Sequence, residues 1–519
     1  MIRQIGLRNV RLFGDIGYNF DLPALSIFTG TNSSGKSTIL KSFLLLRQSQ
    51  GLYETYGARP GILRLTGSQV DLGNYQSFVT DRNPERDVEI SITVQEKMPS
   101  RVVRELAKNK NLALKLPSSQ DNIDYILNSS FLFKSFKSAT ETDEAGQIST
   151  VAPQGLLDSA DFSIIVNEMQ ISSWHVKKRR GATRYRLYFP LSEICEWDKG
   201  LKTYQQKSSN LDEELIVTTE LDGLIPSNVI FGENRFSKTD QDKLPEQLPV
   251  HIRGTLRQFT KTLRRIHYLA PLRTAAKRYY LTNFDVTADL DPSGDFLPYI
   301  LGGIIEEPIV YDVPPNLKLK IEHKLSQALD NWLYYLRTGM GFNSSSARDE
   351  FKSSTHKGTL VEISLKALKG ELKHSIADSG FGYSQVLPIL VRGLIAPPNS
   401  TLIIEQPELH LNPALQVRLA DFFISLVRAG KQVIIETHSE HIVDALRVRT
   451  AQEKDGYLSN NSKIYFIDIK RGRPALHDMS IKPDGTLPEW PINFFGEAAS
   501  LTGELLRAQK EHRRREKTQ

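Results

Sequence analysis

One eight-residue stretch near the start of the chain constrains its fold more than any other feature. Residues 30–37 read GTNSSGKS and fit the phosphate-loop pattern G-x-x-x-x-G-K-[ST] at every fixed position. The apolar run 24–29 predicts a short buried strand before the loop, and the run 38–46 predicts a mostly buried helix after it. A strand, a glycine loop and a helix N-terminus in this order form an anion site, because backbone N–H groups and the positive helix end face the same point. A chance glycine turn would not explain the strand and the helix on either side.

The pattern assigns roles to the polar residues of this loop. Lys36 is expected to reach the β- and γ-phosphates of ATP, and the Ser37 hydroxyl is expected to ligate Mg2+. The other positions are expected to hold phosphate through the backbone. The predicted nucleotide-binding residues are Gly30, Thr31, Asn32, Ser33, Ser34, Gly35, Lys36, Ser37 and Thr38.

Polar residues also follow two strand patterns in the last third of the chain. The run 401–404 predicts a short apolar strand that ends at Glu405, where an acidic residue would hold the water shell of Mg2+. A second strand, predicted at 432–435, leads to His438, which could sense the γ-phosphate or hydrogen-bond the attacking water. The alternatives are a solvated strand end and a polar helix N-terminus. A metal site of His410, His438 and His441 lacks supporting cysteine or carboxylate spacing.

Two predicted helix starts lie close to these strands in the sequence. Asn412, followed by proline, predicts an N-cap with proline in the first turn of a helix over 413–428. Upstream, a glycine loop precedes a helix expected to begin near Tyr383, which makes a second candidate phosphate contact. A plain tight turn explains the same glycines equally well. The residues of this loop are Ser379, Gly380 and Gly382.

Composition excludes several classes of protein. The apolar share of 39% and the charged share of 24% are ordinary for a soluble globular protein, and 519 residues suffice for more than one domain. No apolar run reaches the roughly 18 residues of a membrane helix, so no membrane association is expected. A single cysteine, Cys195, allows no intrachain disulfide, and the first residues read as a strand rather than a signal peptide. We therefore expect a cytoplasmic location.

Basic residues are clustered although the net charge is only +6. Such clusters either contact nucleic-acid phosphates or form solvated faces, and the sequence leaves both open. Trp174, Tyr185 and Tyr188 stand beside the first cluster as candidate stacking surfaces for bases. The clusters are Lys177, Lys178, Arg179, Arg180, Arg184 and Arg186; Arg257, Lys261, Arg264 and Arg265; and Arg513, Arg514 and Arg515.

The pattern along the chain divides it into four segments. Residues 1–95 are expected to form the N-terminal part of the nucleotide-binding domain (the head), which contains the phosphate loop. Residues 96–355 are expected to form an inserted lobe or regulatory region. Within that region, residues 316–337 predict one long helix. Residues 356–480 form the C-terminal part of the head, and residues 481–519 form a short tail that ends in a charged helix.

The order of these motifs resembles that of ABC-type ATPase heads of the SMC, RecF and overcoming-lysogenisation-defect (OLD) group. A branch of bacterial OLD-like AAA ATPases, often with a small C-terminal domain of uncharacterised function, is similar over most of the chain. The resemblance implies an α/β fold, with an ABC-type two-lobed P-loop ATPase head and a large α+β insertion. The stretches that carry it are NSSGKST, DLGNYQSF, YLAPLR, DSGFGYSQVLPIL, IIEQPELHLNP, IETHSEH and PEWPINFF.

The resemblance also implies ATP and Mg2+ as cofactors and a head-to-head homodimer or higher homo-oligomer that closes around the nucleotide. It assigns phosphate and Mg2+ binding to Lys36 and Ser37, the Mg2+-associated acid to Glu405, the contact across the dimer to Ser379 and Gly380, the interface loop to Asn412, and the switch histidine to His438.

One position departs from the family pattern. Many relatives carry a second carboxylate directly after the acidic strand end as catalytic base, whereas this chain has Gln406, which cannot accept a proton as a base. Either Glu405 or Glu408 substitutes, with His438 orienting the water, or hydrolysis is slow and the protein acts as an ATP-gated clamp. The glutamine loop of the family is not placed, and Gln48 and Gln76 are its candidates.

For biology, the resemblance implies the sensor or regulatory ATPase subunit of an anti-phage defence system, as in Septu-type systems. Such a subunit controls a nuclease or toxin, and because no DxD pair follows His438, we expect the effector to be a partner protein. Two further hypotheses remain: a RecF-like ATP-gated, DNA-binding repair clamp, and a scaffold with a slow or vestigial ATPase.

Overall fold

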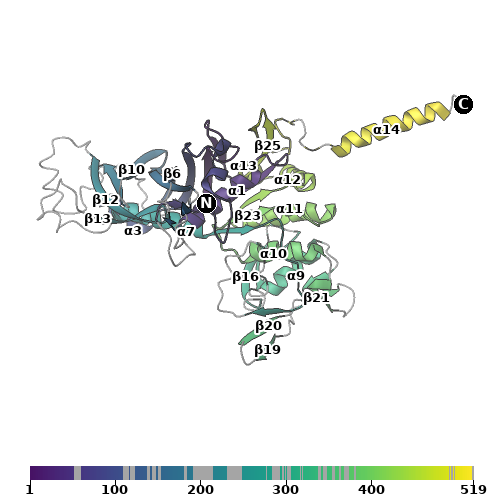
Figure 1. The fold of residues 1–519 in the computed structure, drawn as a ribbon. Coiled ribbons are helices and arrows are strands. Elements are labelled where there is room, and N and C mark those ends of the chain that lie inside the picture. Colours follow the sequence, from purple (N-terminus) through teal and green to yellow (C-terminus); the bar gives the residue numbers. More distant parts are fainter. Residues whose placement is uncertain are drawn as a thin grey trace, which may run out of the picture.

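The computed structural model places most of the chain in mixed α/β structure (Figure 1). It describes residues 1–51, 60–108, 116, 123–136, 141–142, 148–149, 153–179, 184–190, 214–230, 248–275, 277–282, 293–294, 297, 300, 305–315, 317, 319–336, 340–342, 348–352, 357–361, 364–367, 373–378, 381–489, 491, 495 and 497–516.

A six-stranded sheet lies at the centre of the described part, with strand order β14-β23-β24-β3-β25-β26. The strands from β14 to β25 are parallel, and β26 is antiparallel to β25. The strand that comes first in the chain, β3, lies between β24 and β25, so the carboxyl ends of the parallel strands meet at one edge. The bounds are β3 Leu25–Gly30, β14 Ile266–Leu269, β23 Thr401–Glu405, β24 Gln432–Glu436, β25 Ser462–Lys470 and β26 Arg473–Met479.

Both faces of this sheet are buried, which explains the continuous apolar runs in its sequence. In β23, Ile403 packs into one core, whereas Leu402 and Ile404 pack into the other. In β24, Ile434 and Ile435 likewise belong to opposite cores, as the period of two in a strand requires. Helix α1 contributes to the first core, and α10, α11 and α12 contribute to the second. These helices are α1 Lys36–Ser49, α10 Phe381–Ile395, α11 Pro413–Arg428 and α12 Glu440–Gln452.

An antiparallel sheet forms a lobe on the α1 side, with order β13-β12-β11-β10-β9-β6-β5-β1-β2 and β4 paired to β9. Figure 1 shows it extending away from the parallel sheet, together with α3 Ser100–Lys108 and α7 Val250–Arg264. The bounds are β1 Ile2–Arg8, β2 Tyr18–Asp21, β4 Ile62–Leu63, β5 Val88–Lys97, β6 Asp124–Phe136, β9 Gln154–Val166, β10 Met169–Lys178, β11 Tyr185–Pro190, β12 Glu214–Asp222 and β13 Ile225–Ile230.

A second lobe, between β14 and α10 in the chain, combines α9 with short strands. The single helix expected over 316–337 is wrong in its first half, where β17 pairs with β16 and α9 begins only at Leu325. Residues 317–322 read LKLKIE, an alternation of apolar and charged residues that favours a strand. The bounds are β15 Tyr280–Thr282, β16 Pro308–Asp312, β17 Lys320–Lys324, α9 Leu325–Tyr335, β18 Met340–Phe342, β19 Arg348–Lys352, β20 Lys357–Val361, β21 Ser364–Ala367, β22 Lys373–Ser375 and η3 Ile376–Asp378.

The charged C-terminal helix expected from the sequence is α14, Glu497–Glu516, which projects away from the rest of the molecule (Figure 1). No helix in the described segments is both long and apolar enough to cross a membrane. The α/β class expected from the sequence is confirmed. The remaining short elements are α2 Tyr75–Phe78, η1 Thr80–Arg82, β7 Glu141–Thr142, β8 Ile148–Ser149 and α13 Tyr457–Asn461.

Candidate nucleotide-binding site

The loop between β3 and α1 has the backbone that its glycines predict. Gly30 has φ 133°, and a Cβ atom there would lie 2.0 Å from the carbonyl oxygen of Ile467, so a side chain cannot fit. Gly35 has φ 99° and is the N-cap of α1, which begins at Lys36. The loop therefore directs the N-terminus of a buried helix towards the carboxyl edge of the sheet, which is the arrangement of an anion site.

The ammonium group of Lys36 is held over this loop. Its Nζ donates to the carbonyl oxygens of Thr31 at 2.7 Å and Gly30 at 3.1 Å. Burial lowers the pKa of Lys36, and the nearby carboxylate of Glu436 opposes that shift. Lys36 thus places a positive charge where the sequence pattern expects phosphate. Around it, Thr31 and Ser37 are half-buried, Asn32 and Ser33 are exposed, and Ser34 and Thr38 are buried.

A glutamate that the sequence analysis did not assign faces Ser37. Ser37 Oγ donates to Glu436 Oε1 at 3.0 Å, and the other carboxylate oxygen, Oε2, is buried without a hydrogen-bond partner among the described residues. Burial is the main cause that raises the pKa of Glu436. The signal was present in the sequence, because the predicted strands 401–404 and 432–435 are each followed by glutamate.

Glu405 lies directly beside Glu436 at the end of the neighbouring strand. The two residues are paired in the register of β23 and β24, and both are almost fully buried. Tyr268, on β14, donates its hydroxyl to Glu405 Oε1 at 3.0 Å. Burial and the neighbouring Glu436 raise the pKa of Glu405 to about 7. Two adjacent carboxylates of this kind require a cation to ionise together at low cost.

Glu408 lies beside His438, but it contacts the backbone of this residue and not its imidazole. Glu408 accepts hydrogen bonds from Thr437 Oγ1 at 2.8 Å and from the backbone N–H of His438 at 2.7 Å. Both carboxylate oxygens are therefore engaged in fixing the segment that carries the histidine. The His438 side chain is exposed at the same edge, and partial burial together with Lys36 lowers its pKa.

Gln406 occupies the position after the acidic strand end in an unusual conformation. Its φ is 44°, and its backbone N–H donates to the carbonyl of Glu436 at 2.7 Å. The carboxylates that flank it, Glu405 and Glu408, already accept hydrogen bonds from Tyr268, Thr437 and His438. On the adjacent strand, Glu436 Oε2 is a buried carboxylate oxygen without a hydrogen-bond partner among the described residues.

A further charged residue, Arg273, was also missed by the sequence analysis. It follows β14 in the stretch YLAPLR and donates from Nη2 to the carbonyl oxygen of Glu405 at 3.1 Å. Burial lowers its pKa to about 10, so the guanidinium stays charged at neutral pH. No short-range sequence pattern could place it here, because 132 residues separate the two partners.

Asn412 is the N-cap that the sequence predicts for α11, with Oδ1 accepting from the N–H of Leu415 at 3.0 Å and proline in the first turn. Gly382 lies in the first turn of α10, where an added Cβ would approach the carbonyl of His410 at 3.4 Å. Ser379 and Gly380 lie outside the described residues.

Two alternatives raised by the sequence find no support. Gln48 is buried on α1, where its side chain donates to the Arg64 carbonyl and accepts from two backbone N–H groups, so it is committed to structure. Gln76 is exposed on α2. Across the described residues, no three His, Cys, Asp or Glu side chains form a metal-binding group. The metal site of His410, His438 and His441, which already lacked supporting spacing in the sequence, is thus not formed among these residues.

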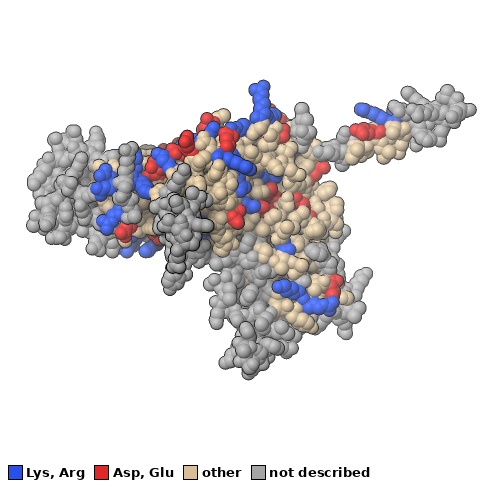
Figure 2. All heavy atoms as spheres, in the orientation of Figure 1, with Lys and Arg blue, Asp and Glu red and all other residues tan. Residues whose placement is uncertain are grey.

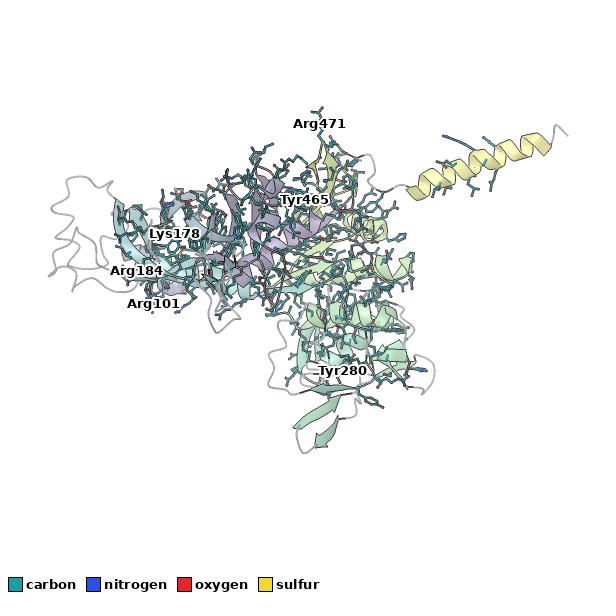
Figure 3. All side chains as sticks on the ribbon, viewed as in Figure 1. Arg101, Lys178, Arg184, Tyr280, Tyr465 and Arg471 are labelled. Carbon is teal, nitrogen blue, oxygen red and sulfur yellow. The ribbon has the colours of Figure 1, made fainter. Side chains whose placement is uncertain are left out.

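Of the three aromatic residues proposed beside the first basic cluster, Tyr188 is half-buried with its ring 5.7 Å from that of His175, and the other two are not available for stacking on bases. Trp174 is buried and stacks on Phe162, and Tyr185 is buried with its hydroxyl donating to the carbonyl of Leu157. Figure 3 shows Arg101, Lys178 and Arg184 together on the antiparallel lobe. On the face in Figure 2, lysine and arginine are mixed with aspartate and glutamate. On α7, three exposed basic residues at helical spacing form a stripe: Arg257, Lys261 and Arg264.

Comparison with known families locates one recognised domain. Residues 315–443 match the family model described as AAA ATPase domain. The match covers less than half of the chain; it includes Glu405, Glu436 and His438 and leaves out the phosphate loop. No curated protein matches the chain.

Comparison with solved structures returns heads of SMC proteins. The "SmcHead bound to the C-winged helix domain of ScpA" has a TM-score of 0.36 and 12% identity, covering 93% of this chain and 98% of that chain. The Smc head with an extended coiled coil, bound to the C-terminal domain of ScpA from Pyrococcus furiosus, has a TM-score of 0.35 and 10% identity over 98% and 99%. The SMC head domain from Thermotoga maritima has a TM-score of 0.34 and 8% identity over 92% and 98%.

Residues 315–443 are thus similar to an AAA ATPase domain, and they supply part of the site. The carboxyl edge of the parallel sheet brings together a phosphate loop, a pair of glutamates, a histidine and a buried arginine, all of which contact or neighbour one another through the interactions described above.

Proposed function

We propose that the protein binds ATP with Mg2+ at the carboxyl edge of the parallel sheet and hydrolyses it. The observation that carries this proposal is the contact between the phosphate loop and a strand-end carboxylate, Ser37 Oγ to Glu436 Oε1 at 3.0 Å. Serine and carboxylate are the protein ligands that, together with substrate phosphates, usually hold Mg2+. Lys36 and the N-terminus of α1 supply the positive potential for the phosphates.

The residues present fit a magnesium ion. Glu436 Oε2 is a buried oxygen without a partner among the described residues, and Glu405 adds a second carboxylate beside it. Ser37, Glu436 and Glu405 would hold the ion, directly or through water. When bound, Mg2+ neutralises charge on the phosphate oxygens during transfer.

The role of the remaining residues follows from their positions. His438, held by Glu408 at the same edge, is suited to accept a hydrogen bond from the attacking water, because its lowered pKa keeps the imidazole neutral. The base that Gln406 cannot provide has no direct substitute among these carboxylates, because Glu405 and Glu436 are assigned to the ion and both oxygens of Glu408 accept hydrogen bonds. Glu408 then acts as a positioning residue.

The experiment that tests this proposal measures nucleotide binding and Mg2+-dependent phosphate release for a small set of variants. Lys36→Ala is expected to abolish both, and Ser37→Ala is expected to lower turnover at least about tenfold, because it removes a ligand of the ion. Ser42→Ala is the matched control: Ser42 lies on the same helix and donates only to the carbonyl of Thr38. If ATP consumption survives Lys36→Ala, the site is assigned wrongly.

At the level of biology, we propose that the protein is an OLD-like sensor or regulatory ATPase of anti-phage defence. It would dimerise around nucleotide, through Ser379, Gly380 and Asn412, and control a nuclease or toxin in trans. The support is the motif resemblance together with the nucleotide edge described above. Pull-down of partners from a host that encodes the neighbouring genes tests it: the absence of any nuclease or toxin partner would favour a different role.

A second candidate is an ATP-gated clamp with slow or vestigial hydrolysis. Gln406 is the observation that favours it, because the side chain at that position cannot act as a base. The exposed basic stripe on α7 is the feature that DNA binding in a RecF-like clamp would use. Stable binding of unhydrolysed ATP, with salt-sensitive affinity for DNA, would distinguish this candidate from the first.

A further inference from the structure

Arg273 is a buried cation whose hydrogen-bonding capacity is only partly used. Its side chain is one of the buried charged groups, with 5% of its surface exposed. Nη2 donates to the carbonyl of Glu405, while Nε and Nη1 have no partner among the described residues. A guanidinium presents five N–H donors, and a buried charge without an anion is strongly destabilising. The position therefore calls for an anionic partner.

The carboxylates nearest to Arg273 are already engaged. The charge of Glu408 raises the pKa of Arg273, but both carboxylate oxygens of Glu408 already accept hydrogen bonds, from Thr437 Oγ1 and from the backbone N–H of His438. Glu405 contacts Arg273 through its backbone carbonyl and uses its carboxylate to accept from Tyr268. Nε and Nη1 of Arg273, both buried, thus lack an anionic hydrogen-bond partner in the described part of the chain.

The place of Arg273 in the fold limits what that anion can be. Strand β14 is parallel to β23, and the connection that carries Arg273 leaves from the same carboxyl edge as the phosphate loop. Tyr268 and Arg273 both donate hydrogen bonds to Glu405, and Glu405 is paired with Glu436 in the register of β23 and β24, so these groups share one small region. A nucleotide seated on the phosphate loop directs its terminal phosphate towards this strand-end region.

The backbone carbonyl of Arg273 accepts a hydrogen bond from helix α10. Gln385, on α10, is 2% exposed and donates from Nε2 to the carbonyl of Arg273 at 3.4 Å. Helix α10 begins directly after Ser379 and Gly380. Arg273 therefore has side-chain donors at the carboxyl edge of the parallel sheet, and its backbone carbonyl is hydrogen-bonded to α10.

We infer that Arg273 binds the terminal phosphate of a nucleoside triphosphate and so distinguishes it from a diphosphate. Through Gln385, this contact transmits the state of the nucleotide to α10. The inference rests on the proposed function, since it requires nucleotide on the phosphate loop. It adds to that function a residue that binds the third phosphate.

The test compares the affinity for a non-hydrolysable ATP analogue with the affinity for ADP, both with Mg2+, by titration calorimetry. Arg273→Gln is expected to weaken binding of the analogue by about tenfold or more, the usual loss for a charge-assisted hydrogen bond, and to change ADP affinity by less than about twofold. The measured quantity is the ratio of the two affinities, which a purely structural role would leave unchanged.

The chain offers a matched control in Arg47. It is a buried arginine on α1 that donates to the carbonyl of Ile266, at the opposite end of β14. Arg47→Gln is expected to lower stability without altering the ratio of affinities. Arg273→Lys is the second variant, because it keeps a positive charge but loses the planar fork of donors. It serves the same comparison if Arg273→Gln does not fold.

The outcomes separate the inference from the proposed function. If the wild-type protein binds neither nucleotide, the proposed function fails, and the inference with it. If the wild-type protein binds both and the Arg273 variants keep its ratio of affinities, the inference alone is overturned. Equal weakening of both nucleotides likewise overturns it, since Arg273 would then only support the fold. A selective loss of the triphosphate supports it.

Discussion

Glu405 and Glu436 end neighbouring strands, and their carboxylates meet in a buried environment. Burial raises the pKa of both groups, and a neighbouring carboxylate raises it further: Glu436 acts on Glu405, and Glu408 acts on Glu436. A magnesium ion at this edge would remove the cost of ionising both.

This pair predicts a pH dependence for stability without nucleotide. The pKa of Glu405 is about 7 in the folded protein, against an ordinary value of 4.5, so the folded state binds more protons between these values. The free energy of unfolding that Glu405 contributes is therefore present below about pH 4.5 and is lost as the pH rises through 7. Glu405→Gln removes this term.

The measurement is denaturant unfolding of the wild-type protein and Glu405→Gln between pH 5 and 8. The variant is expected to gain stability relative to wild type as the pH rises, by at most on the order of 3 kcal/mol, with no further gain above about pH 8. A difference that is independent of pH would show that Glu405 titrates near its ordinary value.

Among the helices and strands, those with strong local signals were predicted well. The strand ending at Glu405 is a short apolar run, and α11 begins at an Asn-Pro pair, so both follow from neighbouring residues alone. The helix expected over 316–337 failed because its first part alternates with the period of a strand.

The part of the site that the sequence did not reveal depends on contacts between distant segments. Tyr268 and Arg273 reach Glu405 only because β14 pairs with β23, and 137 and 132 residues separate these partners. The same limit explains Trp174, whose neighbours in the sequence are basic but whose ring stacks on Phe162 in the core.

The start of α11 yields a prediction at the scale of one element. Asn412→Ala removes the hydrogen bond from Leu415 N–H to the cap and is expected to lower the free energy of unfolding by about 1 kcal/mol. Asn412→Asp is the control, because aspartate caps a helix equally well. Denaturant unfolding measures both variants, and equal stability of Asn412→Ala and wild type would mean that the cap contributes nothing here.

For the molecule as a whole, the nucleotide edge lies where the parallel core meets the connection to the second lobe. Strand β14 belongs to the core, and the chain passes from it through Arg273 into that lobe, which returns through α10. At the phosphate loop, Asn32 and Ser33 are exposed. A bound nucleotide would therefore offer one side to solvent or to a second copy of the chain, which is the geometry that a composite site in a dimer requires.

This reasoning predicts dimerisation that depends on ATP. Sedimentation of the wild-type protein is expected to shift from monomer to dimer on addition of Mg2+–ATP, whereas Lys36→Ala is expected to remain monomeric because it cannot hold the phosphates. Ser379→Arg is expected to bind ATP with unchanged affinity but to stay monomeric, since the resemblance places Ser379 against the nucleotide of the second copy. Asn228→Arg, at an exposed position of β13, is the control for the added charge and is expected to dimerise normally.

The opposite result would be equally informative about the whole molecule. An oligomer that does not change with ATP, and that retains the nucleotide without releasing phosphate, would contradict the composite site. Gln406 would then be the residue to examine first, because it replaces the carboxylate that would act as base. Gln406→Glu is expected to raise phosphate release if that missing base is what limits turnover, and to leave release unchanged if another group at this edge already serves in its place.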